Sequence, residues 1–143
     1  MADTLTRMQR SERMSRVRGK DTKPEMAVRR LVYGMGYRYR LHGKNLPGTP
    51  DLVFQGRKKV IYVHGCFWHR HRDPNCKRAR LPKSRLEFWL PKLEGNRQRD
   101  QWNQSELCRL GWKFLVVWEC QLSDIEERKQ NIREFLGDTN AFG

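Results

Sequence analysis

The sequence predicts an α/β fold in which a mixed central β-sheet is flanked by helices. Its apolar segments follow the order helix, three strands, helices, strand, helix along 143 residues. A strand that follows a long helical stretch favours a mixed sheet with helices on its faces. Because there is no internal repeat and no low-complexity linker, we expect a single domain over residues 21–143, preceded by a basic arm over residues 1–20.

The first half of the domain predicts a helix followed by a β-hairpin. Thr22-Lys23-Pro24-Glu25 has the form of a capping box with proline in the first turn, and Gly34 and Gly36 are expected to end the helix. The apolar stripe of this helix has helical spacing: Ala27, Val28, Leu31, Val32 and Met35. Strands are expected over residues 37–41, 51–54 and 60–63, separated by turn-rich segments.

The second half predicts a basic loop over residues 70–83, a long polar helix, a buried strand over 113–118 and a last amphipathic helix over 124–136. Residues 84–87 have the form of a second capping box. Pro91 is expected to kink or split the long helix, and Gly111 to stop it. Ser123 is the expected N-cap of the last helix.

The charge of the chain indicates a polyanion as partner. There are 30 Lys and Arg against 16 Asp and Glu, a net charge of +14, which is typical of nucleic-acid binders. The arm carries six basic residues: Arg7, Arg10, Arg13, Arg16, Arg18 and Lys20. We expect it to order on a phosphate backbone, although charge alone does not distinguish such an arm from a solvated tail.

The sequence indicates a cytoplasmic protein with reduced thiols and no membrane partner. No apolar run approaches the ~20 residues of a transmembrane helix, and the N-terminal segment lacks the apolar core of a signal peptide. In that compartment, the four cysteines favour metal ligation over disulfides.

Two neighbouring strands bring metal-binding chemistry together. Asp51 begins one strand directly after Pro50, and the next strand ends at Val63-His64. A carboxylate and polar groups on adjacent strands can converge on a divalent cation, which activates water and neutralises phosphate charge in phosphodiester hydrolysis. Mg²⁺ prefers oxygen ligands, so Asp51 is the best candidate ligand. An aspartate that merely caps a turn after proline is the open alternative.

A second candidate metal site uses sulfur and nitrogen. Three residues of one loop and one at the end of a later strand can close a tetrahedral zinc site: Cys66, His71, Cys76 and Cys120. Zinc would brace a long loop that has little core of its own. His69 could replace His71, but the histidine that serves as a base cannot also be a ligand. Cys108 lies between Leu107 and Leu110 in a helix and is expected to be a buried core cysteine.

Aromatic residues beside these sites are candidates for insertion between base pairs. Phe67 and Trp68 lie on a loop, and Trp89 lies on the following helix. Insertion costs unstacking energy that is least at a mismatch, so such a wedge favours mismatched steps. The helical spacing of Trp89 would suit a core residue equally well, and Trp112 and Trp118 are expected to be core.

The motifs resemble those of known nucleases. Pro-Asp followed by a hairpin resembles the restriction-endonuclease-like nucleases, although Val63-His64-Gly65 stands where these usually carry Glu-x-Lys or Asp-x-Lys. Five segments, in order over roughly residues 7–122, resemble the very-short-patch repair DNA mismatch endonucleases. They are Leu-Pro-Gly-Thr-Pro-Asp at 46–51, Val-His-Gly-Cys-Phe-Trp-His at 63–69, Arg-Leu-Glu-Phe-Trp-Leu at 85–90, and Gly-Trp at 111–112 with Val-Trp-Glu-Cys at 117–120.

This resemblance implies a restriction-endonuclease-like fold with a zinc-braced loop and a magnesium-dependent reaction. The reaction is a nick in one strand beside a T:G mismatch, which arises when 5-methylcytosine is deaminated. Asp51 would be the central Mg²⁺ ligand, and the carbonyl of Val63, where the family usually has threonine, would be another. Glu25 would hold a metal-bound water, a role compatible with its place in the capping box. His69 would be the general base, and His64 would orient neighbouring groups.

The resemblance also assigns the remaining residues. Asp100 would assist His69 or water. From the sequence alone, and not from the resemblance, Asn96 is a candidate for a hydrogen bond to a base edge or phosphate. Phe67, Trp68 and Trp89 would insert from the major-groove side, and Met14 would approach from the other side. The zinc ligands would be the four named above, without Cys108.

The expected partner is double-stranded DNA with a T:G mismatch, with mismatch-repair proteins as further partners. A nucleoid-associated monomer in a bacterial-type cytoplasm is expected, since nicking one strand needs one active site. Two alternatives stay open. A zinc-stabilised DNA-binding protein without catalysis leaves Asp51 and His69 unexplained. A different nuclease, with a histidine and one metal, would cut matched and mismatched DNA equally.

Overall fold

The computed structural model describes residues 21–139. The predicted arm over residues 1–20, with Met14, lies outside the described residues. A four-stranded mixed sheet has the order β1-β2-β3-β4. Its strands are β1 (Arg40–Leu41), β2 (Leu52–Phe54), β3 (Lys59–His64) and β4 (Lys113–Trp118). The first three are antiparallel neighbours, and β4 runs parallel to β3.

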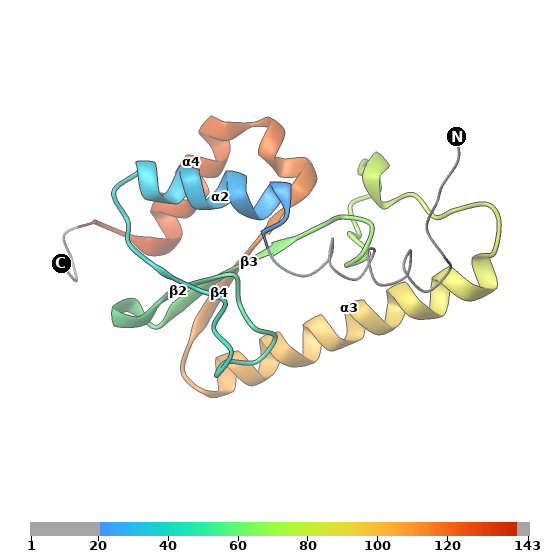
Figure 1. Ribbon diagram of the computed structural model, residues 1–143, viewed down its shortest axis with the longest axis horizontal. Helices are drawn as coiled ribbons and strands as arrows, with labels where there is room; N and C mark the ends of the chain where they lie inside the picture. The colour runs from blue at the N-terminus through green and yellow to red at the C-terminus, as the bar shows by residue number, and fades with distance from the viewer. Residues whose placement is uncertain (1–20, 140–143) are drawn as a thin grey trace, which may run out of the picture.

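Three helices cover this sheet: α2 (Lys23–Gly34), α3 (Leu86–Arg109) and α4 (Ile125–Leu136). Figure 1 shows α2 and α4 side by side over one face, while the long α3 runs along the other. The predicted fold class, a mixed sheet flanked by helices, is therefore confirmed. None of the described helices is both long and apolar enough to cross a membrane.

Alternation along β3 creates one apolar core on each face of the sheet. Ile61 packs with Val28 of α2 and Ile132 of α4. Val60 and Tyr62, on the other face of the strand, pack with Leu107 of α3. Successive side chains of a strand point to opposite faces. His64, two residues after Tyr62, therefore faces α3, while Val63 faces α2.

The start of α2 follows the predicted capping box in part. The Thr22 side chain accepts a hydrogen bond from the Glu25 amide at 3.3 Å, as an N-cap does. The Glu25 carboxylate, however, accepts from the amide of Asp21 at 3.1 Å. β1 spans two residues instead of the predicted five over 37–41. The reason is that Tyr37 is buried in the core below α2, and its hydroxyl donates to the Gly137 carbonyl.

The predicted capping box at the start of α3 was wrong. Its N-cap is Arg85, in the left-handed region at φ 56°, with no side-chain capping bond, so residues 84–87 form no capping box. Pro91 does not split the helix, because α3 continues through it as one helix of 24 residues. The Glu87 carbonyl lacks its helical hydrogen bond, because proline has no N–H to donate. Both residues are exposed, so water can bond this carbonyl instead. Gly111 follows the helix at φ 91°, as predicted.

Three further predictions are corrected. Asp124 caps α4 by accepting from the Glu127 amide at 3.1 Å, whereas Ser123 donates to the Cys120 carbonyl. Cys108 is exposed, since its neighbour Leu107 takes the buried position on α3. Trp112 packs against the core below α3 as expected, but Trp118 is only half-buried and stacks on His71.

Candidate active site

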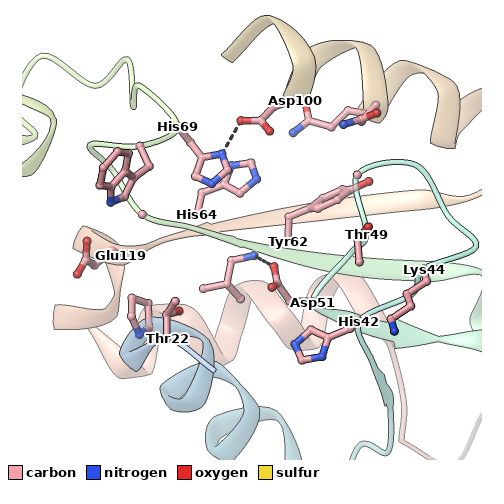
Figure 2. Close-up of a pocket in the computed structure, with 17 residues that line it drawn as sticks. Thr22, His42, Lys44, Thr49, Asp51, Tyr62, His64, His69, Asp100 and Glu119 are labelled. Carbon is pink, nitrogen blue, oxygen red and sulfur yellow. Dashed lines mark hydrogen bonds and ion pairs between the residues drawn. The ribbon is translucent and has the colours of Figure 1, made fainter. Parts of the chain in front are cut away.

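A pocket of about 440 Å³ opens where β2 begins and β3 ends. Figure 2 shows that its side chains come from both strands, the loop after β3, the start of α2 and the middle of α3. It is lined by four of the five residues predicted to be catalytic and by the second predicted Mg²⁺ ligand: Asp51, His64, His69 and Asp100, with Val63. Segments far apart in the sequence thus deliver their polar groups to one cavity.

Asp51 is fixed to the neighbouring strand by its side chain. Because Leu52 pairs with Ile61 in the antiparallel ladder, Asp51 lies at the level of Tyr62 and Val63. Its Oδ2 accepts the Val63 amide at 2.7 Å. Burial raises the pKa of Asp51 from 3.8 to about 7; the bond from Val63 opposes this increase, and the nearby Glu25 carboxyl adds to it. The Asp51 carboxyl, buried beside a second carboxyl, forms a site whose negative charge a cation would stabilise.

The Asp51→Asn variant is expected to be more stable than the unaltered protein at pH 8 in magnesium-free buffer. Folded Asp51 keeps its proton up to about pH 7, whereas the unfolded chain loses it near 3.8, so stability falls as the pH rises through that window. At about 1.4 kcal/mol per pH unit, the cost at pH 8 is at most roughly 4 kcal/mol. Urea unfolding at pH 5 and pH 8 measures the difference in free energy of unfolding between the variant and the unaltered protein. An equal gain in stability at both pH values would contradict the raised pKa of Asp51 as its cause.

Glu25 is fully buried at the start of α2 beside this carboxylate. Its Oε2 pairs with the guanidinium of Arg29 and lies 2.8 Å from His42 Nε2. Sequence patterns did not reveal these two partners. The spacing of Arg29, one turn after Glu25, was a weak signal for the first. The other partner, His42, is revealed only by the pairing of β1 with β2, which places the His42 amide 3.0 Å from the Asp51 carbonyl oxygen.

His69 and His64 form a stacked pair under α3. The rings are 3.9 Å apart between centroids and 3° from parallel. His69 Nδ1 lies 2.6 Å from Asp100 Oδ2, drawn as a dashed line in Figure 2. A carboxylate only accepts, so the proton lies on Nδ1 and the lone pair on Nε2. Burial, together with His69 and His71, lowers the pKa of His64 well below its usual range, so His64 is neutral.

The four predicted zinc ligands lie together at the end of β4. The ligand atoms of Cys66, His71, Cys76 and Cys120 all lie within 4.8 Å of one another, so the cluster could hold a metal ion. The Cys120 amide donates to Cys66 Sγ at 3.4 Å. Burial lowers the pKa of His71, which keeps its ring neutral as a ligand. His69 pairs with Asp100 instead, and Cys108 lies outside the cluster.

The three predicted intercalating aromatics form one cluster between the loop after β3 and the start of α3. The ring centroids of Phe67 and Trp68 are 5.1 Å apart, and those of Phe67 and Trp89 are 5.4 Å apart. All three are half-buried, so Trp89 belongs to this cluster and to neither apolar core. Asn96 donates from Nδ2 to the Trp68 carbonyl at 3.0 Å and so holds the loop.

Comparisons with known proteins found one family model and several similar proteins. The family model described as DNA mismatch endonuclease Vsr matches residues 2–78. The type II nicking enzyme V.XorIIP of Xanthomonas oryzae pv. oryzae is 50% identical over 136 residues, which is 95% of this chain and 98% of that protein. The type II nicking enzyme V.NmeAIP of Neisseria meningitidis is 42% identical, covering 87% and 86%. The DNA mismatch endonuclease Vsr of Escherichia coli K12 is 40% identical, covering 89% and 80%.

Proposed function

The chain belongs to the Vsr family of DNA mismatch endonucleases, which are restriction-endonuclease-like, and on that basis we propose that it uses Mg²⁺ to nick one DNA strand beside a T:G mismatch left by deamination of 5-methylcytosine. One observation carries the proposal. Asp51, hydrogen-bonded to Val63, shares a pocket with the His69–Asp100 pair. This is a cation site next to a base, which phosphodiester hydrolysis needs.

The donor atoms around Asp51 suit magnesium. The Asp51 carboxylate and the Val63 carbonyl provide oxygen, and the Glu25 carboxylate beside them adds negative charge. When bound there, Mg²⁺ would neutralise charge on the scissile phosphate and make water a better nucleophile. The half-buried position of Asp51 strengthens its attraction for a cation, because charges in such surroundings are poorly screened.

The protein groups then divide the proton chemistry. His69 accepts the proton of the attacking water on Nε2, and Asp100 holds the ring by its Nδ1–H and stabilises the imidazolium that forms. Glu25 orients the water from the Asp51 side. Neutral His64 supports the His69 ring by stacking without opposing its positive charge.

Zinc is the metal we propose for the Cys66–His71–Cys76–Cys120 cluster, because three thiols and one imidazole form a closed, soft ligand set. Such a site has no open position for water and is structural. It fixes the loop after β3 to the end of β4. That loop carries Phe67, Trp68 and His69, so the metal would position both the wedge and the base.

Mismatch selectivity is proposed to arise from the aromatic cluster Phe67–Trp68–Trp89. Three rings in mutual contact form an apolar wedge that can stack on unpaired bases, and the step beside a T:G pair is cheaper to open than a matched one. Asn96 supports the wedge through Trp68 and would bond DNA with its remaining capacity. The arm over residues 1–20, including Met14, is proposed to grip the opposite groove.

The remaining organisation of the protein follows from this proposal. Residues 21–143 would be the single endonuclease domain. The protein would act as a monomer with mismatch-repair proteins as partners, in the nucleoid of a bacterial cytoplasm.

Replacing Trp68 by alanine is expected to reduce the preference for T:G over matched duplexes about tenfold or more, since stacking by one aromatic ring contributes roughly 1–3 kcal/mol. Binding competition between the two duplexes measures the preference. Trp102→Ala is the matched control, because that tryptophan is 64% exposed on α3, away from the pocket. Equal preferences in the Trp68→Ala variant and the unaltered protein would remove the wedge from the account.

A substrate panel tests the proposed function. Duplexes that differ only in one central pair, T:G, T:A or C:G, are incubated with zinc-loaded protein with and without Mg²⁺. We expect Mg²⁺-dependent cleavage of the T:G duplex alone. Equal cutting of all three indicates the less selective nuclease, and binding without cutting indicates the DNA-binding protein without catalysis.

A further inference from the structure

A charged cluster borders the active-site pocket on the α2 side and consists of Asp21, Glu25, Arg29 and His42. The side chains of Glu25, Arg29 and His42 are 1%, 13% and 16% exposed. Polar groups at such depth cost free energy unless they are paired. Each of these three side chains bonds another member of the cluster, although Arg29 Nε has no hydrogen-bond partner among the described residues. The ligand-type atoms of Asp21, Glu25 and His42 lie within 4.8 Å of one another, a spacing that would suit a metal ion.

The guanidinium of Arg29 occupies the place of a cation in this cluster. Its Nη2 lies 2.5 Å from Asp21 Oδ1 and 3.3 Å from His42 Nε2, and it also donates to Glu25 Oε2. One nitrogen therefore donates to both carboxylates and lies beside the His42 ring. Burial by itself would lower the pKa of Arg29, but the hydrogen bonds and charges of Asp21 and Glu25 together raise it, and the positive charge is permanent.

His42 connects Glu25 with Asp51. Its Nε2 lies 2.8 Å from Glu25 Oε2, and since a carboxylate only accepts, Nε2 carries the proton and donates. Its backbone amide donates to the Asp51 carbonyl at 3.0 Å. The residue has a φ of 52°, in the left-handed region that residues with a side chain rarely adopt. Such strain persists where surrounding contacts hold the backbone in place. Figure 2 shows the ring beside Asp51 in the pocket.

We infer that Arg29 and His42 are positioning residues for DNA cleavage, which hold the Glu25 carboxylate against Asp51. Arg29 also serves as a built-in cation, at a place where Asp21, Glu25 and His42 would otherwise bind a second divalent ion. The inference rests on the proposed function, in which Glu25 orients the attacking water. Both Glu25 oxygens are already bonded, Oε1 to the Asp21 amide and Oε2 to the two positioning residues. The carboxylate is therefore preorganised, and a displacement of about 1 Å in such a group can cost a hundredfold in rate.

Four variants test the inference in zinc-loaded full-length protein: His42→Ala, His42→Gln, Arg29→Gln and Arg29→Lys. Single-turnover nicking of the T:G duplex is measured across Mg²⁺ concentrations. His42→Ala is expected to lower the rate by roughly tenfold to a hundredfold. His42→Gln restores an N–H donor to Glu25 and is expected to recover most of that loss. Equal rates for the alanine variant and the unaltered protein, or no recovery with glutamine, would overturn the positioning role of His42.

A second readout needs no cleavage. Mn²⁺ binding without DNA is followed by electron paramagnetic resonance, with about one ion per chain expected in the unaltered protein. Arg29→Gln removes the built-in cation and is expected to bind about two ions, whereas Arg29→Lys keeps the charge and binds about one. An unchanged stoichiometry in Arg29→Gln would overturn the built-in cation.

The matched controls are Arg30→Gln, the exposed neighbour on α2, and Asn45→Ala, an exposed residue of the loop after His42. Both are expected to match the unaltered protein in rate, stoichiometry and melting temperature. Failure of the proposed function would appear in the unaltered protein as absent T:G-dependent nicking. The manganese stoichiometry would still decide the inference about Arg29.

Discussion

Replacing Asp51 by alanine is expected to lower the rate of nicking at a T:G mismatch about a thousandfold while leaving the affinity for the duplex within a few-fold. Asp51 is the only acidic side chain hydrogen-bonded to the β3 backbone among the described residues, and it lies where β2 opens into the pocket. Loss of the proposed Mg²⁺ ligand removes several kcal/mol of transition-state stabilisation. A thousandfold decrease in rate corresponds to about 4 kcal/mol. Affinity depends mainly on phosphate contacts elsewhere.

The measurement is a single-turnover nicking rate together with a binding titration in Ca²⁺. Asp138→Ala is the control, because this aspartate is exposed after α4 and does not line the pocket. Nicking by the Asp51→Ala variant at the unaltered rate would remove Asp51 from the catalytic centre.

The Cys120→Ser variant is expected to lose its bound zinc and to nick at least about a hundredfold more slowly. Cys120 follows β4, whereas the other three ligands lie on the loop after β3, so it alone attaches that loop to the sheet through the metal. Without this link, the loop that carries Trp68 and His69 loses its attachment through the metal. Misplaced catalytic groups lower a rate by about a hundredfold. Zinc content by atomic absorption and the nicking rate are measured on the same sample.

Cys108→Ser provides the matched control for the zinc prediction. Cys108 is exposed on α3 and lies outside the ligand cluster, so the zinc content and the rate are expected to stay unchanged. Zinc bound by Cys120→Ser as tightly as by the unaltered protein would contradict the proposed ligand set.

The order of elements and the placing of the chemistry could be predicted from the sequence. Apolar periodicity depends on short-range spacing, which also determines which side of a strand or helix is buried. For this reason the α/β class followed from the pattern. The hairpin between β2 and β3 brought Asp51 to Val63, because the loop that joins two antiparallel strands also sets their register.

The remaining features depend on contacts between segments that are distant in the sequence. Ser84 has the right neighbours for a capping box, yet the chain enters α3 through Arg85 in the left-handed region. Cys108 and Leu107 are adjacent on one helix, and only the direction of α3 across the sheet decides which is buried. His42 reaches Glu25 because β1 pairs with β2, a register that no local pattern reveals.

The central claim, that this pocket nicks one strand at a T:G mismatch, is tested most directly by mapping the cut. A duplex with one T:G pair is labelled on the T strand or on the G strand and is incubated with zinc-loaded protein and Mg²⁺. We predict one product, cut in the T strand beside the mismatch, and an intact G strand. Cuts in both strands, or at positions unrelated to the mismatch, would contradict the account.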